Sequence, residues 1–242
     1  DPPIFGSLDS KDQRKFLVEP FAADFRANQE GLLLSADGFT AQFPYDTTGK
    51  ASGLLSVAER ELTDLSRSIW GSLKATFTLK KPVTDALNIT DWRASSAPKL
   101  AGKPLPIPKN ERSWSLAIAP DKSGFVLGTD WSVRYFKASG EEVWNRTTSG
   151  IAWAMNTNGK VVVAALGDGT LRWYRVSDGK EILALFPHKD RKRWVLWTPS
   201  GNYDASPGGE DLIGWHVNNG REKESSFFAA SRFRSTFYRP DV

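Results

Sequence analysis

The chain has 242 residues, of which 40% are hydrophobic and 12% aromatic, and its 32 basic and 28 acidic side chains leave a net charge of +4. The absence of Cys excludes cysteine nucleophiles, disulfides and thiolate metal sites, and the charge falls short of the concentrated basic footprint of a nucleic-acid-binding domain. The sequence has no run of about 18 apolar residues, so we expect no membrane contact through a spanning helix.

The N-terminal half gives weak strand signals. Segment 37–43 joins an Asp-Gly turn to an apolar stretch and predicts a first strand unit. Segment 56–63 fits either a strand or a short helical turn. Segments 80–83 and 99–108 carry much of the proline and predict irregular connections. A second weak copy of the unit begins at 89–93.

The clearest signal is an internal repeat in the second half of the chain. Segment 130–136 aligns with 168–174, because Arg134 and Arg172 occupy the same place in each and a glycine follows in the next turn. The period is about 40 residues, as expected for WD-like propeller blades. Segment 210–216 is a degenerate third copy, so with the two upstream copies the unit recurs about five times.

The best-defined unit predicts four short strands joined by tight turns. Asn158-Gly159 and two Asp-Gly pairs mark the turns. The strands are expected at 151–155, 161–166, 170–176 and 181–186. Four antiparallel strands at this period are typical of one propeller blade, whereas the alternative is a β-sandwich with an accidental repeat. We therefore expect an all-β fold, a WD-repeat-like β-propeller of about five blade-like units over residues 1–220, best defined over 89–220, either closed or part of a larger ring.

The tail differs from the rest. Residues 221–242 are expected to form a short helical or irregular segment that packs on the propeller and leads to a linker. Within 222–237 the aromatic residues are spaced as helical turns would place them. They are Phe227, Phe228, Phe233 and Phe237.

Few residues suit catalysis or metal binding. His188 and His216 are the two histidines, and without a further nitrogen ligand they do not predict a zinc site. No nucleophile elbow, phosphate-binding loop or dinucleotide motif occurs. We expect no enzymatic activity, no cofactor and no metal. The basic residues of 189–197 lie beside Trp194 and Trp197 and could grip a single nucleic-acid strand, but a solvated loop followed by a buried strand is the favoured interpretation.

A family resemblance rests on the C-terminal part of the chain. The Trp-rich run 193–209, followed by 213–218, resembles the WD-repeat-like propellers of bacterial proteins that also carry a caspase-like peptidase domain. Segments 112–120, 185–188 and 233–242 fit the same pattern, so the resemblance extends over 89–242. It implies that the peptidase, with its His–Cys pair, is a separate domain that would follow the propeller. It also implies a ring of more blades than the repeat count here.

The combined expectation is a non-catalytic protein–protein recognition or scaffolding module. The resemblance implies the regulatory propeller of a caspase-like protease system in the bacterial cytoplasm, with the peptidase domain or its substrate as partner. Trp and Arg dominate binding hot spots. The candidate binding residues are therefore Trp131, Arg134, Arg172 and Trp194, although each could instead brace neighbouring blades. The alternatives are a small-molecule or glycan site in a central funnel, a nucleic-acid site at 189–197, or a piece that only completes a larger ring.

Overall fold

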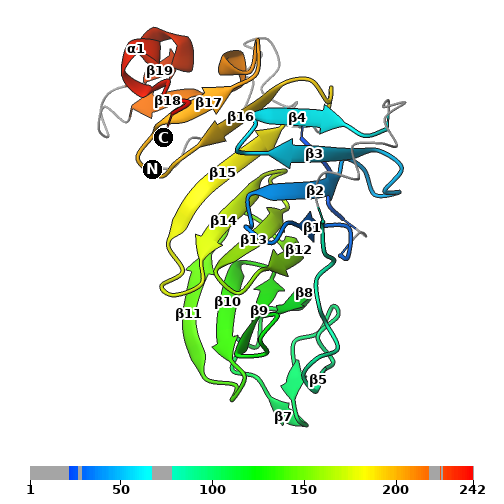
Figure 1. Cartoon of the computed structure of the whole chain (residues 1–242). Coiled ribbons are helices and arrows are strands. Elements are labelled where there is room, and N and C mark those ends of the chain that lie inside the picture. The colour runs from blue at the N-terminus through cyan, green and yellow to red at the C-terminus, as the bar shows by residue number, and fades with distance from the viewer. Residues whose placement is uncertain (1–21, 27–28, 67–77, 218–223, 225, 242) are drawn as a thin grey trace.

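The computed structural model describes residues 22–26, 29–66, 78–217, 224 and 226–241. Their secondary structure is almost entirely β, in antiparallel sheets that follow one another in an open stack (Figure 1). The expectation of an all-β fold is confirmed. None of the described sheets closes on itself.

The N-terminal sheet has four strands in chain order. They are β1 (Leu33–Leu34), β2 (Thr40–Pro44), β3 (Ser52–Ser56) and β4 (Glu61–Asp64). The weak unit predicted at 37–43 therefore belongs to a four-stranded sheet. Segment 56–63, which left strand and helical turn open, forms the end of β3, a tight turn and most of β4, because Leu55 pairs with Leu62.

The segment that follows forms only a small sheet. Its strands are β5 (Ile89–Thr90), β6 (Lys99–Leu100) and β7 (Lys103–Pro104). Single bridges at Lys80 and Val83 attach the preceding chain to β1 and to β8. The weak copy at 89–93 thus supplies one two-residue strand rather than a four-stranded unit. Segment 80–83 is irregular as predicted, apart from the two bridges. The prediction of an irregular connection at 99–108 is wrong for its first half, because the backbone of 99–104 pairs as β6 and β7.

The two strong repeats each form a regular antiparallel meander. The first contains β8 (Ser113–Ile118), β9 (Gly124–Thr129), β10 (Ser132–Lys137) and β11 (Glu142–Thr147). The second contains β12 (Ala152–Thr157), β13 (Val161–Leu166), β14 (Leu171–Arg175) and β15 (Glu181–Pro187). All four strands predicted for this repeat are confirmed. The sheet does not end there, because the end of β15 pairs with β16 (Trp194–Trp197), which pairs in turn with β17 (Tyr203–Ala205).

The third copy predicted at 210–216 is not a blade. It forms the 3₁₀ turn η2 (Glu210–Leu212) and strand β18 (Gly214–Val217), which pairs with β19 (Ser226–Ala229). The helical tail is confirmed only at its end, in η3 (Ala230–Phe233) and α1 (Arg234–Phe237). Phe227 and Phe228 lie in β19 instead, because their backbone pairs with β18. The tail packs against β15–β17 through Phe237 and Tyr238.

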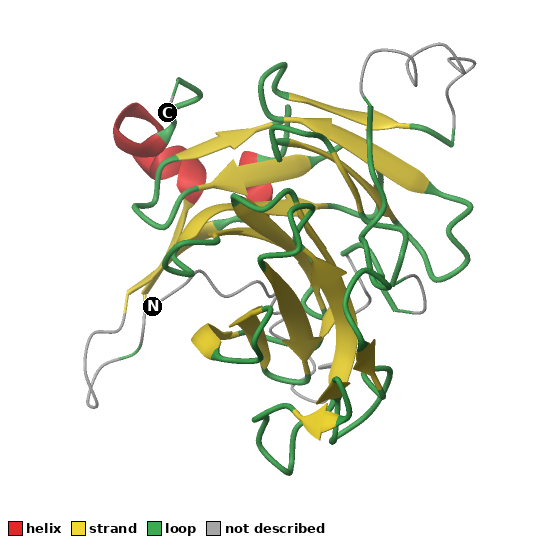
Figure 2. Ribbon diagram, turned by 60° about the horizontal axis from the view of Figure 1, so that its bottom comes forward, coloured by secondary structure: helices red, strands yellow, loops and turns green. Residues whose placement is uncertain are grey.

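The sheets stack face to face, and the sheet that begins with β12 lies in the middle. Strand β13 explains why: all six of its residues are buried, as expected for a strand covered on both faces. Val163 and Ala165 pack towards the N-terminal sheet, whereas Val162 and Ala164 pack towards β8–β11. Figure 2 shows the stacked sheets from a second direction.

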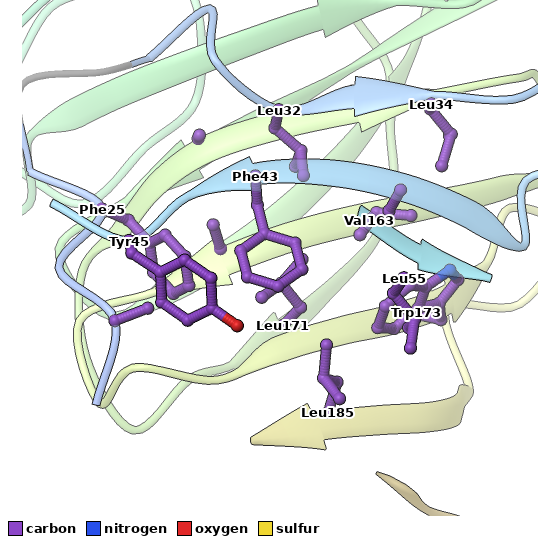
Figure 3. Close-up of a cluster of buried hydrophobic side chains, with 14 of the residues drawn as sticks. Phe25, Leu32, Leu34, Phe43, Tyr45, Leu55, Val163, Leu171, Trp173 and Leu185 are labelled. Carbon is purple, nitrogen blue, oxygen red and sulfur yellow. The ribbon is translucent and has the colours of Figure 1, made fainter. Parts of the chain in front are cut away.

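The core between the N-terminal and middle sheets joins residues far apart in sequence. Phe43 and Leu55 lie over Leu171, Trp173 and Leu185 (Figure 3). The indole N–H of the fully buried Trp173 donates to the carbonyl of Gly38 at 2.8 Å. Residues 33–64 are thereby fixed against the middle sheet. Another core lies on the opposite face of β8–β11, where Phe125 and Phe136 stack beside Trp92.

Candidate functional site

The β9–β10 hairpin exposes a large aromatic side chain. β9 ends at Thr129 and β10 begins at Ser132, so only Asp130 and Trp131 join them. Trp131 is 56% exposed, more than any other large hydrophobic side chain among the described residues. Trp is enriched at protein interfaces, because its indole offers a large apolar area together with one hydrogen-bond donor.

Asp130 fixes this hairpin to the start of β8. Its Oδ1 accepts the indole N–H of Trp114 at 2.6 Å, and its Oδ2 accepts the backbone N–H of Arg112 at 2.8 Å. The backbone N–H of Asp130 donates to the carbonyl of Arg112 at 3.0 Å. Three hydrogen bonds to neighbouring backbone and indole groups therefore hold the residue that precedes Trp131.

A pair of tryptophans lies beside the hairpin. The ring centroids of Trp114 and Trp153 are 5.0 Å apart with an angle of 59° between the planes. Both are half-buried and occupy the second position of the first strand in their repeats, β8 and β12. Neither tryptophan was among the candidates expected from the sequence, although the repeat period places the two at equivalent positions and could have identified them.

The equivalent hairpin of the next repeat, between β13 and β14, lies at the same end of the stack. Its Asp168 accepts hydrogen bonds from the backbone N–H of Thr170 at 2.9 Å and from the hydroxyl of Ser149. Trp114, Asp130, Trp131, Trp153 and Asp168 form what we call the hairpin-end surface.

Arg134, selected from the sequence as a binding residue, is buried within its own repeat. Its guanidinium pairs with Glu111 at 2.9 Å and with Glu142 at 2.7 Å. Burial raises the pKa of the Glu111 carboxyl, but hydrogen bonds from Thr129 and Ser132 and the charge of Arg134 outweigh it, so the net pKa lies below its usual range. These contacts link β10 to β11 and to the residues that precede β8.

Arg172, selected for the same reason, has the equivalent surroundings in the second repeat. It pairs with Glu181 at 2.9 Å and lies 3.7 Å from Asp168. Its guanidinium also lies over the Trp197 ring, 5.1 Å from the centroid. Like Arg134 it is about nine-tenths buried, and its contacts connect strands of one sheet.

Trp194 and the basic segment 189–197 do not offer stacking surfaces. Trp194 is 6% exposed and Trp197 7% exposed, so neither ring is open to a base. Arg193 pairs with Asp190 at 2.7 Å, and Arg191 donates to the hydroxyl of Ser66 at 2.6 Å. Burial raises the pKa of Asp190, yet the hydrogen bonds from Arg193 and Lys192 bring it well below its usual value.

A small cavity lies between the β3–β4 turn and β16–β17. Arg60, Trp197, Tyr203 and Arg239 are among its lining residues, and its volume is about 70 Å³. Small-molecule sites usually measure about 300 Å³ or more. None of the described sheets closes on itself, and the site in a central funnel considered from the sequence stays a prediction.

The described residues contain no group of three or more His, Cys, Asp or Glu side chains placed to hold a metal ion. His188 is buried, with its Nδ1 3.0 Å from Asp190 and its ring 3.4 Å from the Arg193 guanidinium. No helix in the described ranges has the length and apolarity that crossing a bilayer requires.

Comparison with known proteins assigns the chain to no family. No family model matches it, and no curated protein matches it. Among solved structures, the computationally designed Ika4 protein is similar at 13% identity and a TM-score of 0.29, over 46% of this chain and 88% of its own. The designed Ika8 protein is similar at 12% identity and a TM-score of 0.36, over 79% of this chain, which spans only 64% of the Ika8 chain.

Proposed function

We propose that this chain is a non-catalytic protein–protein recognition or scaffolding module that binds its partner through the hairpin-end surface. The observation that carries the proposal is the exposed indole of Trp131 on a hairpin held by Asp130. Interface hot spots are typically aromatic side chains presented from a rigid support, because little conformational entropy is lost on binding.

The neighbouring residues support this choice of surface. Trp114 and Trp153 are half-buried, so together with Trp131 they give this end of the stack three indoles with solvent-accessible area. The other three residues selected from the sequence are inside the sheets, where Arg134 and Arg172 join strands and Trp194 packs in the core. Trp131 is the candidate from that set whose side chain a partner can reach.

The finer architecture belongs to the same proposal. Two consecutive antiparallel meanders of four strands, at a period of about 40 residues, support an assignment to adjacent blades of a WD-like β-propeller. We assign the open stack to part of a ring of five or more blades. Following the resemblance of segment 193–209, we assign the module to the regulatory propeller of a bacterial cytoplasmic caspase-like protease system, with the peptidase domain or its substrate as partner.

The test is protein capture with a matched pair of variants. The immobilised chain is exposed to lysate of its natural host, and retained proteins are identified by mass spectrometry. Trp131→Ala removes the exposed indole, while Val143→Ala shortens another exposed apolar side chain, 42% exposed, on β11. We expect one protein to be retained by the unmodified chain and by Val143→Ala, and lost with Trp131→Ala.

Two results would contradict the proposal. Retention that Trp131→Ala leaves unchanged would place the binding surface elsewhere. A folded chain that retains nothing would favour the interpretation as a passive part of a larger ring.

A further inference from the structure

Within the described residues, the carboxylate of Asp130 is held in place by uncharged donors alone. Its two oxygens accept hydrogen bonds from the Trp114 indole and the Arg112 backbone amide, and neither donor carries charge. Asp204 and Asp190 differ in this respect, because Asp204 pairs with Arg60 at 2.7 Å and Asp190 pairs with Arg193. Among the described residues the half-buried Asp130 therefore forms no ion pair, and it immediately precedes Trp131, the most exposed large hydrophobic side chain in the same set.

The indole of Trp131 adds a second attraction for the same kind of group. The face of an indole ring carries a negative quadrupole and attracts Arg and Lys side chains. This chain uses such contacts internally, since the guanidinium of Arg93 lies 4.3 Å from the centroid of the Trp92 ring. Trp131, by contrast, is in no such contact with a cation of the described chain and is open to solvent.

The net charge of the chain and the local carboxylate of Asp130 have opposite effects on a cationic partner. The chain as a whole is basic, with a net charge of +4, so long-range electrostatics give a cationic partner no general attraction. Binding of such a partner would depend on the local pair. Arg112 is exposed, and although its backbone amide binds Asp130, its side chain forms no salt bridge within the described residues. Its positive charge opposes a cationic ligand.

From these observations we infer that Asp130 and Trp131 form a docking site for a basic side chain of the partner, an arginine or lysine in an exposed segment. The inference rests on the proposed function and specifies its partner. The cation lies against the Trp131 ring and within reach of the Asp130 carboxylate, which the bonds from Trp114 and Arg112 already orient.

The experiment uses a capped arginine, a small compound that carries the proposed basic side chain, as the probe. N-acetyl-arginine methylamide is titrated into the ¹⁵N-labelled chain, and the indole N–H signals are followed by NMR. The Trp131→Phe variant identifies the Trp131 signal, and Trp114→Phe identifies that of Trp114. The matched probe is N-acetyl-citrulline methylamide, in which a planar, uncharged urea replaces the guanidinium. A titration with sodium chloride at equal ionic strength controls for screening.

We expect saturable shifts of the Trp131 and Trp114 signals with the arginine compound. The affinity derived from the same titration with the citrulline compound should be at least about threefold lower. Asp130→Asn should weaken the arginine compound by a similar factor, whereas Arg112→Gln should strengthen it. An unchanged unfolding temperature of each variant shows that the fold is intact. Should Asp130→Asn itself unfold, the citrulline comparison and Arg112→Gln decide the question in the unmodified hairpin.

Equal binding of the arginine and citrulline compounds would overturn the inference while leaving recognition through Trp131 in place. No saturable shift with either compound would also overturn it, and the capture experiment with Trp131→Ala would then decide the proposed function separately.

Discussion

Arg60 and Asp204 are 144 residues apart in the sequence and form a two-point ion pair in the structure. The Nε of Arg60 lies 2.7 Å from one carboxylate oxygen, and Nη2 lies 3.1 Å from the other. Asp204 is on β17 and Arg60 is in the β3–β4 turn, so this pair fixes the N-terminal sheet to the end of the middle sheet. Arg60 also has a φ of 54°, a left-handed conformation that is unfavourable for a residue with a Cβ.

The ion pair and the backbone strain predict different results for two variants of Arg60. Arg60→Ala loses the pair and keeps the strain, whereas Arg60→Gly loses the pair and relieves the strain. We therefore expect both variants to unfold at lower urea concentration than the unmodified chain, with Arg60→Gly the less affected. The measurement is urea unfolding followed by tryptophan fluorescence. Equal midpoints for all three proteins would mean that the pair does not hold the sheets together.

A second prediction concerns Gly179, in the Asp-Gly turn between β14 and β15. Its φ is 67°, and a Cβ there would lie 2.6 Å from the Trp144 ring. Gly102 is the matched control, because its φ is 79° but a Cβ would meet nothing within 4 Å. We expect Gly102→Ala to cost about 1–2 kcal/mol from backbone strain alone, and Gly179→Ala to cost clearly more because the Trp144 ring must also move.

The free energy of unfolding in urea, measured for both glycine variants, checks this. Equal costs at the two positions would show that Trp144 accommodates the added methyl group without loss of packing.

The network around Glu111 predicts acid sensitivity. Its net pKa in the folded chain is below the ordinary value of 4.5, because the bonds from Thr129 and Ser132 and the charge of Arg134 outweigh burial. A carboxyl whose pKa is depressed by folding stabilises the folded state above its unfolded pKa, and this contribution is lost as the pH falls through the folded pKa.

Glu111→Gln removes that titration. We expect the variant to be less stable than the unmodified chain at pH 7, and the difference between the two to narrow as the pH falls below about 4.5. Thermal unfolding of both proteins between pH 7 and pH 3 measures this difference in stability. A difference that is constant over the whole range would assign the stabilisation to something other than the charge of Glu111.

The buried phenols predict behaviour at alkaline pH. Burial raises the pKa of Tyr45, with the charge of Asp64 adding to the effect, and burial together with the charge of Glu181 raises that of Tyr174. A phenol whose pKa is raised by folding favours the folded state below its unfolded pKa, near 10, and opposes it as the pH rises further. We expect these two tyrosines to ionise only as the chain unfolds.

Phenolate absorbance near 295 nm follows this directly when it is compared with circular dichroism over the same titration. The Tyr45→Phe, Tyr174→Phe double variant should lose most of the absorbance change that coincides with unfolding, and the buried Tyr203, whose pKa burial also raises, should account for the remainder. Ionisation of all five tyrosines before any loss of structure would contradict the expected burial.

Local pattern determined most of the strands. In the second repeat, the run Val161–Leu166 and the turns at Asn158-Gly159 and Asp178-Gly179 define strands and hairpins through neighbouring residues alone. These are the elements whose bounds the sequence predicted closely. The prediction of a helical tail was wrong at Phe227 and Phe228, because their backbone pairs with β18. Local spacing does not show such a pairing.

The order of the sheets and the exposure of individual side chains were decided by tertiary structure. Residues 33–64 stack on the middle sheet through Phe43, Leu55 and Trp173, contacts between distant segments that no periodicity encodes. The same holds for the candidate site. Arg134 and Trp131 are three residues apart and both suit an interface, but Arg134 meets Glu111 and Glu142 inside the sheet, while Trp131 is on the hairpin where strand pairing ends. The sequence by itself determined the residue types and the hairpins, and the packing of one sheet on another decided which side chains solvent reaches, because burial depends on residues far away along the chain.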